Sequence, residues 1–200
     1  MKFIIYLLCL IFSLFLQAYD ENDLTTLKKT KKCENCDLTN ANLSKLDLSN
    51  AMLSGANLSL ANLTNTNFFK ADLSYSSLVK SKIYIANLDF ANLEGANLTE
   101  ARLNGASLRG ANLIDATLIS TVLSKSKLDE IILDGANLKY TKFRGADLQK
   151  AKFNGSILSF TDFSAADLTE AEMIALDLTN SVFTSAKLDK INFMNTNVSG

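Results

Sequence analysis

The sequence predicts an all-β solenoid built from coils of four five-residue sides, and three observations at a spacing of five residues support this. Stepping by five from Leu38 to Val198 visits 33 positions, and each is Leu, Phe, Ile, Met or Val. The residue two before each of these centres is small or apolar, with Ala at 18 of the 33 positions. All eight glycines fall two residues after a centre. A helix repeats apolar residues about every 3.6 positions and a half-buried strand every two, so neither explains this register.

A period of five is satisfied when each pentapeptide forms one short extended side and a turn. Four such sides close a coil of about twenty residues, and successive coils stack like parallel strands about 4.8 Å apart. The centre and the small residue two before it point inward, where one large and one small side chain fill a narrow bore. Glycine suits the turn, and the absence of proline suits a backbone whose amides donate to the next coil.

Residues twenty apart should lie above one another in such a stack, and charged and aromatic residues test this. Two series alternate in sign at this spacing: Glu130, Lys150, Glu170 and Lys190, and Asp89, Arg109 and Asp129. Opposite charges attract along a stack, so the alternation favours the twenty-residue coil. The same spacing predicts one interior column of aromatic rings: Phe143, Phe163 and Phe183.

The repeat unit also resembles that of a known family. Representative units are Ala51–Gly55, Ala56–Leu60, Ala91–Gly95 and Ala146–Lys150. They are similar to the A(D/N)LxX unit of pentapeptide repeat proteins, and the similarity extends over residues 37–200. The resemblance implies a right-handed quadrilateral β-helix, so the predicted fold is all-β, a pentapeptide-repeat solenoid over 37–200 with a short N-terminal helix cap.

Residues 1–18 have the organisation of a targeting segment. Lys2 precedes an apolar run from Phe3 to Leu16, and Ala18 provides the small last residue of a cleavage site. A membrane-spanning helix needs about 20 apolar residues, so this run is short for one. We expect a cleaved signal peptide and export to the periplasm or the medium. The alternative is an uncleaved membrane anchor formed by residues 3–16.

Residues 19–36 are expected to cap the first coil. The stretch 20–32 begins with acidic and ends with basic residues, which suits the dipole of a short helix with Leu24 and Leu27 on one side. Such a helix would cover a backbone edge that is otherwise open to pairing. The lysines at its end indicate a solvated helix end; a binding patch for anionic lipid or nucleic acid is the alternative.

Cys33 and Cys36 fall on inward positions when the register is extended backward, so both thiols should point into the top of the coil. We interpret them as a structural disulfide or as buried thiols. The resemblance implies a cap at the start of the solenoid, since a Cys-x-x-Cys often precedes the first repeat in this family. A redox site lacks the βαβ context that usually accompanies it. A zinc site needs about four ligands, and the chain has no His.

Enzymatic chemistry is not expected. The chain has no His for acid–base catalysis, its carboxylates belong to the repeat, and its glycines follow the turn rule instead of a phosphate loop. We therefore predict no catalytic residues, no cofactor and no metal. The formal net charge is −1, whereas the DNA mimicry known in this family would need a strongly acidic surface. No nucleic-acid partner is expected either.

The remaining candidate is a surface that binds an unknown protein partner. Phe69 and Phe90 are outward on one side in adjacent coils, with Tyr84 and Ile85 around the corner, and exposed apolar groups that coalesce can mark such a site. A second cluster lies on the opposite face: Tyr140, Ile157 and Phe160, near Ile119. The last coil would present an uncovered edge, which predicts a homodimer through the C-terminal coils.

Together these features predict an exported, non-catalytic scaffold or protein-interaction module. The alternative is a membrane-tethered redox or envelope-maintenance factor that uses Cys33 and Cys36. Membrane association is expected only if the N-terminal segment is not cleaved.

Overall fold

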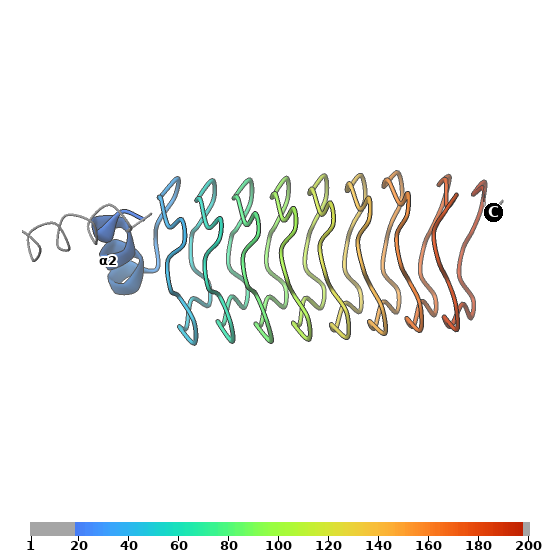
Figure 1. Cartoon of the computed structure of the whole chain (residues 1–200), viewed down its shortest axis with the longest axis horizontal. Coiled ribbons are helices and arrows are strands. Elements are labelled where there is room, and N and C mark those ends of the chain that lie inside the picture. Colours follow the sequence, from blue (N-terminus) through green and yellow to red (C-terminus); the bar gives the residue numbers. More distant parts are fainter. Residues whose placement is uncertain (1–18, 198–200) are drawn as a thin grey trace, which may run out of the picture.

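The structure, a computed structural model, describes residues 19–197. The signal or anchor prediction for residues 1–18 lies outside this range, as does the last centre, Val198. The described chain begins with one α-helix, α2 (Glu21–Thr30), and continues as a long stack of coils (Figure 1). No helix among the described residues is long and apolar enough to cross a membrane.

Successive coils pair through parallel β-bridges between residues twenty positions apart, from Lys32↔Met52 to Asp177↔Asn197. Each coil therefore contains four pentapeptides. The pairing residue is the one before each centre, and a two-residue turn follows the centre, so the predicted extended sides are single bridge positions instead of continuous strands. Pentapeptides twenty residues apart form four columns along the stack, which we name after their first centres: the Cys33, Leu38, Leu43 and Leu48 columns.

The turn at the end of each pentapeptide places its last residue in the left-handed conformation, from Asn35 to Asn195. Seven of these residues are glycines, but most are not, and Ile85 has φ 55°. A β-branched residue in this region is a genuine outlier, because its side chain crowds the backbone. Glycine is therefore favoured at the turn but not required, since the backbone hydrogen bonds of the stack hold other residues there as well.

The core is the bore of the stack. The centres from Leu38 to Leu178 and the Ala residues two before them are buried. The predicted aromatic column is confirmed: Phe143 and Phe163 stack with ring centroids 5.2 Å apart, and Phe163 and Phe183 with centroids 4.9 Å apart. The interior is thus filled column by column, each large side chain lying on the equivalent one of the next coil.

Hydroxyl side chains that replace Ala at the small position have partners in the bore. The Thr121 hydroxyl donates to the carbonyl oxygen of Leu98 in the preceding coil at 2.7 Å, and the Thr141 hydroxyl donates to Leu118 in the same way. No buried side-chain nitrogen or oxygen among residues 19–197 lacks a hydrogen-bond partner. Ser and Thr therefore enter the core without the cost of an unpaired polar group.

Asn and Asp before the centre stabilise both the turn and the stack. The Asn97 side-chain oxygen accepts from the backbone N–H of Thr99 at 3.0 Å, an Asx turn that the short side chain makes possible. Between coils, the Asn87 amide donates to Asn67 Oδ1 at 3.0 Å. This ladder explains physically why the repeat prefers Asn and Asp at this position.

The charge series is realised in part. Arg109 pairs with Asp129 at 3.0 Å and Lys190 with Glu170 at 3.1 Å. Asp89 instead accepts from the backbone N–H of Arg109. Lys150 has no ion pair among the described residues. The twenty-residue register therefore brings opposite charges together only where side-chain direction also allows it.

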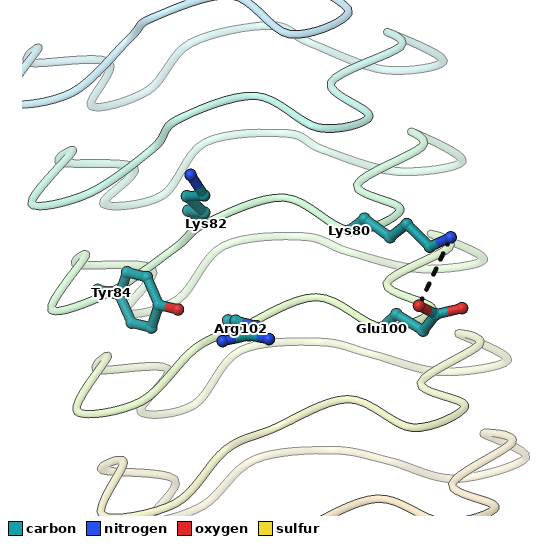
Figure 2. Close-up of a pocket in the computed structure, with 5 residues that line it drawn as sticks. All are labelled: Lys80, Lys82, Tyr84, Glu100 and Arg102. Atoms are coloured by element: carbon teal, nitrogen blue, oxygen red, sulfur yellow. Dashed lines mark ion pairs between the residues drawn. The ribbon is translucent and has the colours of Figure 1, made fainter.

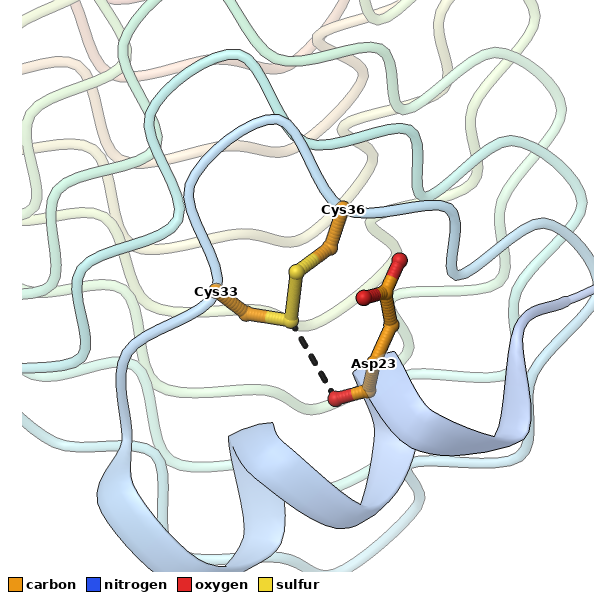
Figure 3. Close-up of side chains that lie close together, drawn as sticks. All are labelled: Asp23, Cys33 and Cys36. Carbon is orange, nitrogen blue, oxygen red and sulfur yellow. Dashed lines mark hydrogen bonds between the residues drawn. A yellow bond between two sulfur atoms is a disulfide. The ribbon is translucent and has the colours of Figure 1, made fainter.

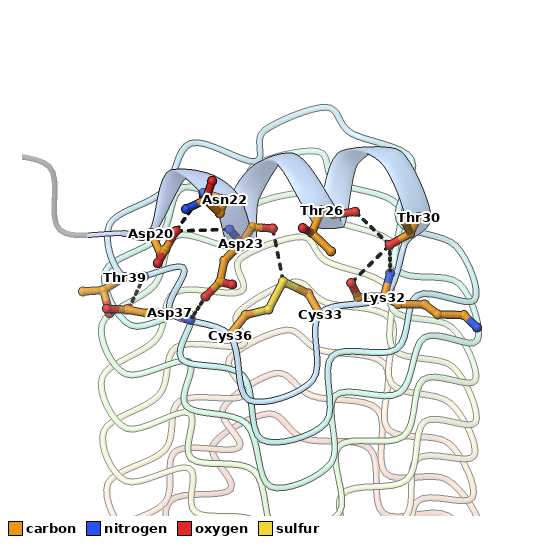
Figure 4. The surroundings of a disulfide bond; sticks show 10 residues. All are labelled: Asp20, Asn22, Asp23, Thr26, Thr30, Lys32, Cys33, Cys36, Asp37 and Thr39. Atoms are coloured by element: carbon orange, nitrogen blue, oxygen red, sulfur yellow. Dashed lines mark hydrogen bonds between the residues drawn. A yellow bond between two sulfur atoms is a disulfide. The ribbon is translucent and has the colours of Figure 1, made fainter.

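Helix α2 lies over the first coil (Figure 4). Asp20 caps its N-terminus by accepting from the N–H of Asn22 at 2.7 Å, and Lys31 closes its C-terminus in the left-handed conformation. Leu27 is fully buried against the coil. The Asp23 carboxylate accepts from the N–H of Asp37 at 2.8 Å, so α2 satisfies a backbone donor at the edge of the stack, as the cap prediction requires.

Candidate functional site

The structure brings together two of the four residues of the predicted partner patch. The rings of Phe69 and Phe90 meet edge to face with centroids 5.9 Å apart, and the Lys70 ammonium lies 5.2 Å from the Phe69 ring centroid. Both aromatic residues belong to the Leu48 column, in adjacent coils. Phe90 is exposed and Phe69 is half-buried. They form a small aromatic surface, which we call the Phe69–Phe90 pair.

The other two residues of that patch lie apart from this pair. Ile85 is the turn residue before the pentapeptide of Phe90, so the length of one side separates them. It is 67% exposed. Tyr84 belongs to the Leu43 column and lines a groove there with Arg102. The sequence analysis expects Tyr84 and Ile85 around the corner from the pair, and in the structure they belong to the neighbouring Leu43 column.

Aromatic turn residues lie over glycines of the next coil. A Cβ added at Gly95 would lie 2.6 Å from ring carbons of Tyr75, and one added at Gly110 would lie 2.8 Å from the Phe90 ring. Tyr75 is 65% exposed, and the sequence interpretation did not include it. The signal that could have identified it is a glycine twenty residues after an aromatic residue at the turn position.

The second predicted cluster is assembled in the structure. The rings of Tyr140 and Phe160 stack with centroids 5.1 Å apart, and the Lys139 ammonium lies 5.1 Å from the Tyr140 centroid. Ile157, in the pentapeptide that ends at Phe160, is half exposed. This cluster lies in the Leu38 column, two columns from the Phe69–Phe90 pair.

The two cysteines lie beneath α2 (Figure 3). Their Sγ atoms are 2.04 Å apart, the separation of a disulfide, and both residues are buried. Cys33 Sγ lies 3.2 Å from the Asp23 carbonyl oxygen. A disulfide sulfur has no proton to donate, so this is a hydrogen bond only in the reduced form. With the Asp23 carboxylate, the two sulfurs make a group of three potential metal ligands. Zinc usually has four ligands.

A groove of ≈ 390 Å³ crosses two coils where the Leu38 and Leu43 columns meet (Figure 2). Its lining residues are Lys80, Lys82, Tyr84, Glu100 and Arg102. Lys80 and Glu100 pair across it at 3.6 Å. The sequence interpretation assigned no role to any of the three basic residues, because it considered the balanced charge of the whole chain.

Titratable groups with perturbed pKa values lie on the surface. A hydrogen bond from Tyr75 to Glu94, 3.1 Å long, raises the pKa of the phenol. Hydrogen bonds from Lys31 and Ser49 lower the pKa of Asp47. The buried polar side chains among residues 19–197 are all Ser or Thr. The described residues thus offer surfaces and a groove for binding.

A comparison with protein-family models matches pentapeptide repeats in eight copies. The matched segments are 32–68, 47–83, 86–124, 118–155, 131–169 and 156–200. The chain belongs to the pentapeptide repeat family. No curated protein matches this pentapeptide repeat protein significantly.

Solved structures of pentapeptide repeat proteins are similar to it. HetL, which is involved in heterocyst differentiation regulation in the cyanobacterium Nostoc sp. strain PCC 7120, is 29% identical, with 80% of this chain and 84% of HetL covered and a TM-score of 0.47. A trypsin-treated variant of QnrB1, a plasmid-mediated fluoroquinolone resistance protein, is 22% identical, with 84% and 83% covered and a TM-score of 0.51. The likeness to QnrB1 is one of fold, a β-helix.

Proposed function

We propose that this pentapeptide repeat protein is an exported, non-catalytic scaffold that binds a protein partner through the Phe69–Phe90 pair. In this proposal the β-helix is right-handed and quadrilateral, and it acts as a rigid support for side chains on its outside. The observation that carries the proposal is the edge-to-face contact of Phe69 and Phe90 on the surface, 5.9 Å between centroids. Aromatic residues are enriched at protein interfaces because they bury a large area at a low cost in conformational entropy.

Phe90 occupies a turn position that glycine favours. Phe90 holds a left-handed conformation with φ 58°, at a position where Gly110 takes its place in the next coil. A non-glycine residue in this conformation costs about 1–2 kcal/mol. The same conformation recurs at every turn of the described stack, so by itself it marks no site. A partner that covers the ring would offset this cost by removing apolar surface from water.

The cysteine pair supports export. Disulfides persist in oxidising compartments outside the cytosol, and in this proposal Cys33 and Cys36 form one. The expected signal segment leads to the same compartment. In this proposal the disulfide links two residues of the first coil, beneath α2, and has a structural role.

A partner capture experiment tests the proposal. The full chain and a Phe69→Ser/Phe90→Ser variant would be immobilised and exposed to the native envelope fraction, with Tyr140→Ser/Phe160→Ser as the matched control. The control removes the same kind of aromatic contact from another column. We expect the unchanged chain and the control variant to capture a partner protein that the Phe69→Ser/Phe90→Ser variant does not capture. Equal capture by all three proteins would contradict the role of the Phe69–Phe90 pair.

The second candidate function is a redox factor that uses Cys33 and Cys36, tethered to the membrane by an uncleaved N-terminal segment. The observation behind this candidate is the Asp23 carboxylate, which lies within 4.8 Å of both sulfurs and can act as a general base for a thiol. Thiol–disulfide exchange needs access to a sulfur, and only 3% of Cys33 and 9% of Cys36 is exposed. The scaffold is therefore the better supported proposal. Rapid exchange with reduced glutathione and an intact Met1 in the mature chain would reverse this preference.

A further inference from the structure

The Leu43 column has a strongly positive net charge on the outside of the stack. It comprises residues 41–45 and every pentapeptide twenty residues further on, to 181–185. Its one acidic residue is Asp162. Its basic residues are Lys45, Lys82, Arg102, Lys125, Lys142 and Arg144. In the Cys33 column from residue 51 onward the balance is reversed, with Lys152 against Asp72, Glu94, Asp115, Asp134 and Glu172. A nearly neutral chain therefore has a strongly basic column.

The basic residues of this column have no carboxylate partners. All six are exposed, and none forms an ion pair with another residue of the range 19–197. The ion pairs that do form belong to other columns, and four of the five join residues twenty positions apart. The same register that pairs opposite charges elsewhere leaves these cations available to a ligand.

Lys82 and Arg102 carry like charges on directly bridged positions of adjacent coils. Bridged residues lie about 4.8 Å apart, and like charges directly opposite each other repel. In Figure 2 the Lys82 side chain extends toward the preceding coil, away from Arg102. An anion bound between the two cations would replace this repulsion by attraction.

The groove beside this pair has donors suited to a compact oxyanion. The Tyr84 hydroxyl lies on the side of Arg102, and the Lys80–Glu100 ion pair closes the other end (Figure 2). A guanidinium binds an oxyanion through two parallel N–H bonds, and a flexible ammonium adds a point charge. Three basic residues and one carboxylate line the groove. Its net charge therefore suits a ligand with more than one negative charge.

We propose that this groove binds a phosphate group, and that the other cations of the Leu43 column attract the molecule that carries this phosphate. The phosphate oxygens accept from the Arg102 guanidinium, the Tyr84 hydroxyl and the Lys82 ammonium, which swings toward the ligand. A carboxylate carries a single negative charge, so it would balance less of the positive charge of the groove than a phosphate does. The site is independent of the Phe69–Phe90 pair, which lies in the Leu48 column.

Titration of the full chain with inorganic phosphate, followed by amide NMR, tests the proposal. We expect saturable shifts at Lys82, Tyr84 and Arg102 that sodium chloride or acetate at equal ionic strength does not produce. Arg102→Gln should weaken binding about tenfold, since it removes a charge-assisted contact. Arg109→Gln is the matched control, because Arg109 is paired with Asp129, and should bind phosphate normally. Equal shifts with chloride, or unchanged binding by Arg102→Gln, would overturn the proposal.

Vesicle sedimentation distinguishes the source of the phosphate. Binding to phosphatidic acid vesicles, whose phosphomonoester carries more than one negative charge, that phosphatidylcholine vesicles do not reproduce, and that Arg102→Gln loses, would identify a lipid headgroup. Phosphate binding without vesicle binding would identify a soluble phosphorylated ligand. Vesicle binding that persists in Arg102→Gln, without any phosphate response, would assign the interaction to another part of the chain and overturn the proposal. Because Lys82 and Arg102 repel, Arg102→Gln should fold with unchanged or higher stability, and urea denaturation of the variant separates lost binding from unfolding.

Discussion

The ring of Tyr75 lies over Gly95 in the next coil, where a Cβ would come within 2.6 Å of two ring carbons. Glycine at position 95 therefore meets two requirements. The turn there is left-handed with φ 63°, and the Tyr75 ring occupies the space that a side chain of residue 95 would need. Gly155 occupies the same column with φ 70° and has nothing within 4 Å of its missing Cβ. The two glycines separate the cost of the turn from the cost of the contact.

Gly155→Ala should destabilise the protein by about 1 kcal/mol, the cost of a left-handed alanine. Gly95→Ala should cost more, because the Tyr75 ring must move and lose its hydrogen bond to Glu94. That hydrogen bond raises the pKa of Tyr75, so the pKa should fall toward its ordinary value in Gly95→Ala alone. Urea denaturation and NMR titration of the tyrosines measure both effects. Equal destabilisation with an unchanged Tyr75 pKa would contradict the packing argument.

Leu98→Ala should destabilise the stack by about 2–5 kcal/mol, because it removes a fully buried side chain and leaves a cavity. Thr99→Ala, one residue further on, changes an outward side chain and should cost less than about 0.5 kcal/mol. In a solenoid each coil contacts only its neighbours, so amide exchange should increase first near residues 78 and 118. A uniform increase along the whole stack would show that the coils unfold as a single cooperative unit.

The period of five was sufficient to predict the bore and the register of the coils. The Phe143–Phe163 stack and the burial of Leu98 follow from counting alone, since inward positions recur at fixed spacing. Helix α2 was predicted from its charged ends, and it occupies Glu21–Thr30 within the expected stretch. In these elements the local residue preferences and the five-residue spacing indicate the same structure, so they could be predicted from one sequence.

The outer surface was less predictable. Tyr84 and Ile85 lie around the corner from the Phe69–Phe90 pair, in the neighbouring column, and that all four residues form one partner surface stays a prediction. The basic Leu43 column was overlooked because charge was summed over the chain instead of over residues twenty apart. A left-handed Phe90 could not be expected from backbone preference, which favours glycine at this turn, because hydrogen bonds to adjacent coils decide its conformation.

Exposed apolar side chains in the last described coil lead us to predict self-association. Val182, Leu188 and Met194 are exposed there. Leu188→Glu and Met194→Glu should therefore keep the chain monomeric, because charges would be buried in an apolar contact. Light scattering of the unchanged full chain should give the mass of a dimer at high concentration, and the two variants that of a monomer. A monomeric unchanged chain would remove this prediction.

The ion pair between Lys31 and Asp47 predicts how stability depends on pH. The Lys31 ammonium contacts Asp47 at 2.9 Å, joining the end of α2 to the first coil. The hydrogen bonds from Lys31 and then Ser49 lower the pKa of Asp47. A carboxyl whose pKa is lower in the folded state stabilises that state above its unfolded pKa of about 3.9, and the contribution is lost as the pH falls through the folded value.

Asp47→Asn should therefore be less stable than the unchanged protein at pH 7, and the difference should shrink as the pH falls below about 4. Asn can still accept from the Ser49 N–H, so the substitution removes the charge and keeps the turn. Asp177→Asn is the control, because the pKa of Asp177 is lowered by Thr179 hydrogen bonds and not by a lysine. Molar salt should reduce the effect of Asp47→Asn and leave that of Asp177→Asn, since salt screens exposed ion pairs. Urea denaturation at both pH values and both salt concentrations would measure this, and equal salt sensitivity would contradict a role for the Lys31 pair.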